Sequence, residues 1–135
     1  MKPEELSVFN YRDEGVGMLE DGLYVLEDKL ADPDFVAKMT KFVRASMKGW
    51  EYARANPEEA AQIIVDNDMT GAMTLEDQVY QISEVNKLTD GSTGVLDEAD
   101  YQQTVDTLLS AVSPDNPAIT KAPEGAFSHV VTDGL

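Results

Sequence analysis

Residues 32–68 read DPDFVAKMTKFVRASMKGWEYARANPEEAAQIIVDND and encode two consecutive helices. Asp32 can cap the first helix because its carboxylate accepts hydrogen bonds from the free N–H groups of the first turn, and Pro33 suits the first helical position. Asn56-Pro57 repeats this signal, so the first helix ends there and a second begins. Apolar residues recur along one side of the first predicted helix, at Val36, Met39, Val43, Met47, Trp50 and Ala53.

The first predicted helix carries a tryptophan on its apolar side and a row of basic residues on its outer side. Trp50, the only tryptophan, lies on the apolar side, where aromatic residues usually pack in a core, so we predict that it is buried. Four basic residues spaced three or four apart form a stripe on the outer side: Lys38, Lys41, Arg44 and Lys48. This stripe is either a solvated face that offsets nearby acids or a surface that docks an acidic partner.

Composition excludes several classes of function. The 135 residues carry a net charge of −16, which argues against nucleic acid or an anionic membrane as the main partner. The chain has no cysteine and one histidine, His129, so we expect neither a metal site nor a catalytic triad, and we expect no cofactor. The first five residues are acidic and lack an apolar core, so we expect no signal peptide in this chain, and no apolar run is long enough to cross a bilayer.

The remaining elements complete an α+β, mostly helical fold. Short strands are predicted at residues 6–9 and 23–26, and they give a short N-terminal β segment. Thr74 begins a third helix, and Asp97 begins a fourth that stops before Ser113-Pro114. We therefore expect one domain or fragment over residues 1–135, organised as short strands and a polar loop (1–31), about four helices (32–113) and an extended tail (114–135).

A polar loop punctuated by glycine follows the first predicted strand. Its side chains offer a ring face, a cation and two carboxylates: Tyr11, Arg12, Asp13 and Glu14. Such a cluster can bind a small polar ligand, and we select these four residues as the candidate ligand-binding site. The alternative is a solvated turn.

Six segments, taken in order, resemble one known family. They are residues 11–16 (YRDEGV), 21–25 (DGLYV), 32–36 (DPDFV), 42–53 (FVRASMKGWEYA), 56–61 (NPEEAA) and 123–127 (PEGAF). Their order and spacing are similar to the C-terminal part of ABC-importer substrate-binding proteins of the nitrate, sulfonate, taurine and thiamine-precursor (SsuA/Thi-five-like) family. Each segment alone is weakly specific, and the succession is what carries the resemblance.

The resemblance implies a fold and a function. Such proteins have two α/β lobes that close on a ligand between them, so this chain would be the C-terminal part of a two-lobed periplasmic-binding-protein fold, with most of the cleft preceding residue 1. The whole protein would be periplasmic or extracytoplasmic and would deliver a small polar solute to the membrane permease of an ABC importer. A thiamine-precursor pyrimidine, taurine or another sulfonate, and nitrate are the solute classes that the family implies.

Other classes of function remain as alternatives. A helical protein–protein interaction module without a small-molecule ligand would use the basic stripe. An enzyme is not expected, although relatives of the family include a pyrimidine synthase that works with pyridoxal phosphate, because this chain lacks the histidines and cysteines of such enzymes. Helices that lack the sheets they would normally cover also predict a homo-oligomer or a chain swap.

Overall fold

A computed structural model describes residues 5–110 and 118–135, which form two units. One unit contains residues 27–95 and 130–135, and the other contains residues 1–26 and 96–129. Helices α1 (Pro33–Ala55), α2 (Pro57–Asp66) and α3 (Leu75–Leu88) belong to the first unit, with the short 3₁₀ helices η2 (Glu27–Ala31) and η3 (Thr132–Gly134). Helix α4 (Glu98–Ser110) belongs to the second.

The four α-helices of the described residues begin where the capping signals predict. Asp32 accepts a hydrogen bond from the backbone N–H of Asp34 at 2.9 Å, and Pro33 starts α1. Thr74 accepts from Asp77 N–H at 3.2 Å, and its hydroxyl also donates to the Asp77 carboxylate. Asp97 accepts from the first turn of α4. The predicted end of the fourth helix, before Ser113-Pro114, lies outside the described residues.

The predicted N-terminal β segment is wrong for this structure. Residues 6–9 and 23–26 contain no strand, and neither does the rest of the described chain. Both segments run as irregular chain with exposed apolar side chains, including Val8 (84% exposed) and Tyr24 (86% exposed). A strand needs a neighbour for its N–H and C=O groups, and the described residues supply none.

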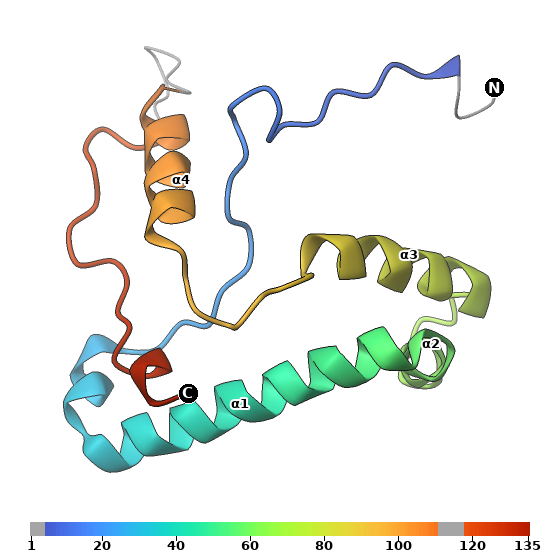
Figure 1. Cartoon of the computed structure of the whole chain (residues 1–135), viewed down its shortest axis with the longest axis horizontal. Helices are drawn as coiled ribbons and strands as arrows, with labels where there is room; N and C mark the ends of the chain where they lie inside the picture. Colours follow the sequence, from blue (N-terminus) through green and yellow to red (C-terminus); the bar gives the residue numbers. More distant parts are fainter. Residues whose placement is uncertain (1–4, 111–117) are drawn as a thin grey trace. The chain divides into compact units, whose positions relative to one another are not determined.

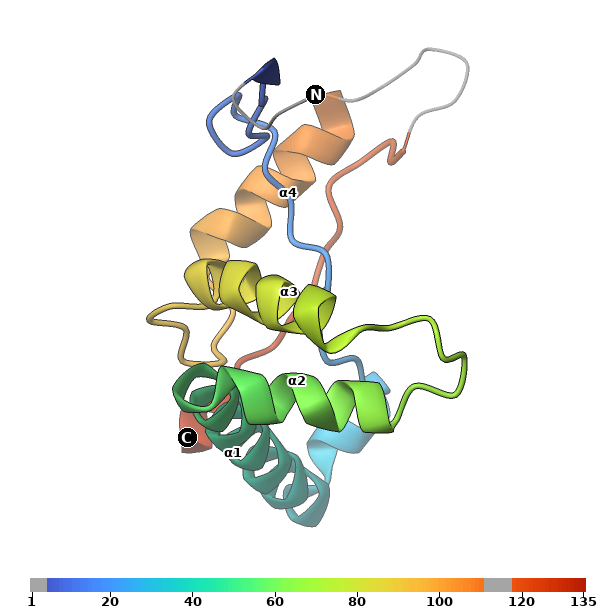
Figure 2. The same ribbon diagram turned by 90° about the vertical axis from the view of Figure 1, so that its right-hand side faces the viewer.

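Helix α1 contacts each of the other described helices of the first unit. Figures 1 and 2 show α2 and α3 joined as a helical hairpin that packs against α1. The buried residues of α1 are Thr40 and Val43, and those of α2 are Ala60 and Ala61, whose small side chains permit close helix contact. Trp50 is 45% exposed, so the prediction that it is buried is wrong. Trp50 lies about two turns beyond the buried Val43 on the same side of the helix.

The C-terminal η3 is tied to α1 by two hydrogen bonds. The Thr40 hydroxyl donates to the Val131 carbonyl at 2.7 Å, and the Arg44 guanidinium donates to the Gly134 carbonyl at 2.7 Å. Figure 1 shows η3 lying on the N-terminal half of α1. These contacts join residues about 90 positions apart in the chain.

The segment after α3 also returns to α1. Arg54 donates to the Thr89 carbonyl at 3.1 Å and lies 3.5 Å from Asp90. Gly94 has a φ of +80°, and a Cβ placed there would lie 2.9 Å from the sulfur of Met47. The positive φ therefore favours glycine at this position, and a larger residue would also have to displace the flexible Met47 side chain of α1.

One carboxylate of this unit is held by a tight network in the loop between α2 and α3. Asp68 accepts from the Thr70 hydroxyl at 2.6 Å, from Thr70 N–H at 2.8 Å and from Met73 N–H at 2.9 Å. These donors, the Thr70 hydroxyl first, lower the pKa of Asp68 to about 2. The loop is thus fixed by its own side chain, although Met69 beside it is fully exposed.

Candidate functional site

The four predicted ligand-binding residues form one tight turn. Asn10 organises it, since its side-chain oxygen accepts from Arg12 N–H at 3.0 Å and its carbonyl accepts from Glu14 N–H at 3.1 Å. Val16 N–H donates to the Tyr11 carbonyl at 2.9 Å and closes the turn. Gly15 has a φ of +77°, a conformation that glycine adopts without strain.

The turn presents its side chains to solvent. Tyr11 is 72% exposed, and Asp13 and Glu14 are exposed as well. Arg12 reaches toward α4, where its guanidinium lies 4.0 Å from the carboxylate of Asp100. The structure therefore links one of the four residues to α4 and leaves the tyrosine and both acids on the surface.

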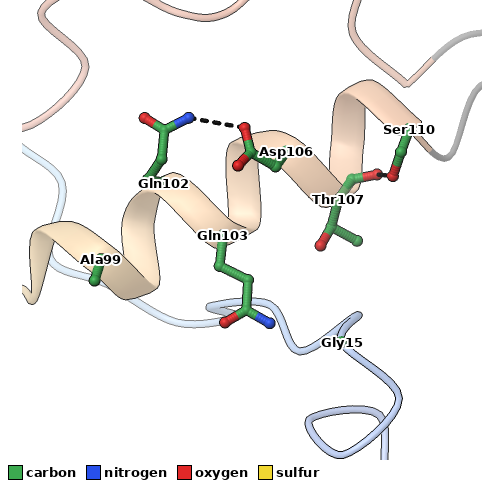
Figure 3. A pocket seen from close by; sticks show the side chains of 7 residues that line it. All are labelled: Gly15, Ala99, Gln102, Gln103, Asp106, Thr107 and Ser110. Carbon is green, nitrogen blue, oxygen red and sulfur yellow. Dashed lines mark hydrogen bonds between the residues drawn. The ribbon is translucent and has the colours of Figure 1, made fainter.

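A hollow of about 520 Å³ lies where this turn approaches α4 (Figure 3). It is lined by Gly15, Ala99, Gln102, Gln103, Asp106, Thr107 and Ser110. Of the polar loop, only Gly15 is in this lining, and the four predicted residues, which precede it in the chain, are not. The volume is within the usual range for a small-molecule site, although the hollow is open to solvent.

Hydrogen bonds along α4 fix part of the lining. Gln102 donates from its amide nitrogen to Asp106 at 2.8 Å, and the Ser110 hydroxyl donates to the Thr107 carbonyl at 3.0 Å. In Figure 3, Gln103 extends toward the segment that carries Gly15, away from the Gln102–Asp106 pair. Amide, hydroxyl and carboxylate groups on this surface can donate to and accept from a polar solute.

Both flanks of α4 are fixed by chain segments of the same unit. The Leu19 backbone N–H donates to the Thr104 hydroxyl at 2.9 Å. Phe127 packs on Tyr101 with ring centroids 4.6 Å apart, and His129 lies edge-on to Phe127 at 5.4 Å. His129 Nε2 also lies 3.6 Å from the Glu98 carboxylate. Phe127, the last residue of the segment 123–127, is thus packed against the helix that lines the hollow.

The site is acidic. Asp106 lies in the lining of the hollow, Asp13 and Glu14 belong to the turn that contributes Gly15, and Arg12 lies beside Asp100. Among the described residues no group of three or more His, Cys, Asp or Glu side chains could hold a metal ion. The surface is suited to hydrogen bonding and to a positive or neutral ligand.

Sequence reasoning missed the residues on α4. Gln102, Gln103 and Asp106 look like the solvated face of an amphipathic helix, and the sequence gives no reason to place the 10–15 turn beside them. The adjacent glutamines, with an acid four residues after the first, were the available signal. Only a long-range contact, such as the hydrogen bond from Leu19 to Thr104, shows that the N-terminal segment lies beside α4.

No described helix combines the length and apolar character that a bilayer crossing requires.

No curated protein and no solved structure matched the chain. A family model described as NMT1/THI5 like matches residues 1–60, which include the polar turn, all of α1 and the start of α2. Members of this family are binding proteins, and the family points to solute-binding proteins of ABC importers. Residues 1–60, which are less than half of the chain, are therefore similar to NMT1/THI5-like proteins, as the succession of motifs in the sequence predicted.

Proposed function

We propose that this chain is the C-terminal part of a solute-binding protein that delivers a small polar solute to an ABC importer. The family match over residues 1–60 is the observation that carries the proposal. The whole protein would act outside the cytoplasm, hand its solute to a membrane permease and catalyse no reaction. Ligand binding would close its two lobes by a hinge, and the permease would recognise the closed state.

The polar turn and α4 support a binding role for this part of the chain. The turn lies inside the matched residues, and the adjacent hollow has a polar lining. We assign Tyr11, Arg12, Asp13 and Glu14 to ligand binding, with Gln103 and Asp106 as further contacts. An open surface hollow offers few contacts by itself, so tight binding would need the other lobe to cover it.

The charge of the site selects among the solute classes of the family. Nitrate and sulfonates are anions, and here they would meet an acidic surface whose cation already faces Asp100. A cationic or aromatic amine, such as a thiamine-precursor pyrimidine, would pair with Asp13 or Glu14 and stack on the exposed ring of Tyr11. We therefore propose the amine class as the ligand.

Thermal shift and calorimetry test both parts of this proposal. The chain and a longer protein that contains it are titrated with thiamine-related pyrimidines, taurine, alkanesulfonates and nitrate. We expect stabilisation of the longer protein by a pyrimidine, and weak or no stabilisation of the chain alone. Stabilisation by taurine or nitrate would refute the amine preference, and no response to the whole panel in either form would refute solute binding.

A matched pair of variants locates the charge requirement. In the longer protein, D13N/E14Q is expected to weaken pyrimidine binding about tenfold or more, because charged hydrogen bonds contribute about 1.5–3 kcal/mol each. E20Q/D21N removes the same two charges from the following exposed segment and is expected to leave the affinity unchanged. Equal affinities for the two variants would exclude Asp13 and Glu14 from the site.

A further inference from the structure

Positive charge is concentrated on one stretch of α1. The whole chain has 26 acidic and 10 basic residues, yet residues 35–50 carry four basic residues and no acidic one. This stretch is the middle of the long helix in Figure 1. A cluster of basic side chains on one helix of an acidic protein produces a local positive potential, opposite in sign to the net charge.

The lysines of this stretch lie opposite the buried side of α1. Thr40 and Val43 are buried, and at about 100° per residue Lys41 and Lys48 point about 140–160° away from Val43 and about 80–100° away from Thr40. The exposed residues between these lysines have small side chains. Ala45 is exposed, and a Cβ placed on Gly49 would meet no atom within 4 Å. Phe42 borders this surface and is 51% exposed. We call the following residues the basic face of α1: Lys38, Lys41, Phe42, Ala45, Lys48 and Gly49.

The lysines of the basic face form no ion pair within the described part of the molecule. Arg44 donates to the Gly134 carbonyl and serves the C-terminal turn. Within residues 5–110 and 118–135, no ion pair engages Lys38, Lys41 or Lys48. Their ammonium groups are therefore available to an external carboxylate.

We propose that the basic face of α1 docks an acidic helix of a partner protein. Lysines around a shallow centre of alanine and glycine allow a second helix to approach closely, with its carboxylates facing the ammonium groups and an apolar side chain against Phe42. Nucleic acid or an anionic membrane extends further and would be repelled by the net charge of −16.

Fluorescence anisotropy with a synthetic helix tests the proposal directly. The probe is a labelled amphipathic peptide with glutamates on its polar face and leucines on its apolar face, and its control replaces every glutamate by lysine. The chain is expected to bind the acidic peptide alone, and the affinity should fall about tenfold or more between low and high salt. Failure to bind the acidic peptide, or equal binding of the lysine peptide, overturns the proposal.

Two charge-matched variants separate the basic face from general electrostatics. K41Q/K48Q removes two lysines of the face and is expected to weaken peptide binding about tenfold. K87Q/K121Q removes the same charge from exposed lysines elsewhere and should change binding less than twofold, with helicity of both variants checked by circular dichroism. Equal losses in the two variants, or binding to anionic lipid vesicles in place of the acidic peptide, overturn the proposal.

Discussion

Asp68 shows how a single side chain sets the pH response of a loop. Its folded pKa of about 2 lies below the ordinary value of 3.8, so the charged form is favoured in the folded state. The resulting stabilisation is fully present above pH 3.8 and is lost as the pH falls toward 2. We expect Asp68→Asn to lower the midpoint of thermal unfolding at neutral pH and to reduce its decline in this acid range.

The measurement for Asp68 is thermal unfolding by circular dichroism between neutral pH and pH 2. Asp28→Asn removes an exposed carboxylate from the same unit and serves as the matched control. An acid response of the Asp68 variant identical to that of the wild type would mean that the hydrogen bonds from Thr70 and Met73 do not persist in solution.

At single positions the sequence predicts local chemistry and misses distant contacts. The caps at Asp32, Thr74 and Asp97 could be recognised because donor and acceptor lie within three residues of each other. The bond from Leu19 to Thr104 joins residues 85 positions apart and has no local signal. The polar turn was therefore predictable as a candidate site, whereas its neighbours on α4 were not.

Between elements, the link from α1 to η3 offers a direct test. The buried hydroxyl of Thr40 donates to the Val131 carbonyl, and valine at this position keeps the shape but removes the donor. We expect Thr40→Val to lower the free energy of unfolding by about 1–2 kcal/mol, because the partly buried Val131 carbonyl loses its donor. Urea titration followed by circular dichroism measures the change.

Thr93→Val is the control for this link, because Thr93 is exposed in the same unit. Its effect is expected to stay within about 0.5 kcal/mol, the usual range for a surface substitution. Similar losses for the two variants would show that the contact between α1 and η3 adds no stability.

Helices and strands differ in how far sequence alone predicts them. A helix satisfies its backbone internally and carries its start signals with it, which is why α1 to α4 begin at the predicted residues. A strand depends on a neighbour that can lie anywhere in the chain or in another chain. The short apolar segment at residues 6–9 therefore could not show that a partner strand is missing from the described residues.

For the molecule as a whole, exposed apolar side chains predict self-association. Val8, Phe9, Leu23 and Tyr24 are each at least 60% exposed. Contacts between chains would bury them, while the net charge of −16 opposes association, so added salt should promote it. This response is opposite to that expected at the basic face of α1, where salt weakens binding.

Sedimentation velocity over a range of protein and salt concentrations measures this association. V8S/Y24S should reduce it, whereas S7A/E20Q in the same segment should not. A monomer under all conditions would contradict the prediction and would show that these side chains are tolerated in water.

The pairing of Gly94 with Met47 constrains the order in which this sequence can change. Any side chain at position 94 meets both a left-handed backbone and the sulfur of Met47, but a shorter side chain at position 47 removes the second obstacle alone. A substitution of Gly94 should therefore destabilise the protein less when Met47 has already been replaced by a shorter residue than when Met47 is still present. Among descendants of this chain, the two positions should show epistasis although 46 residues of sequence lie between them.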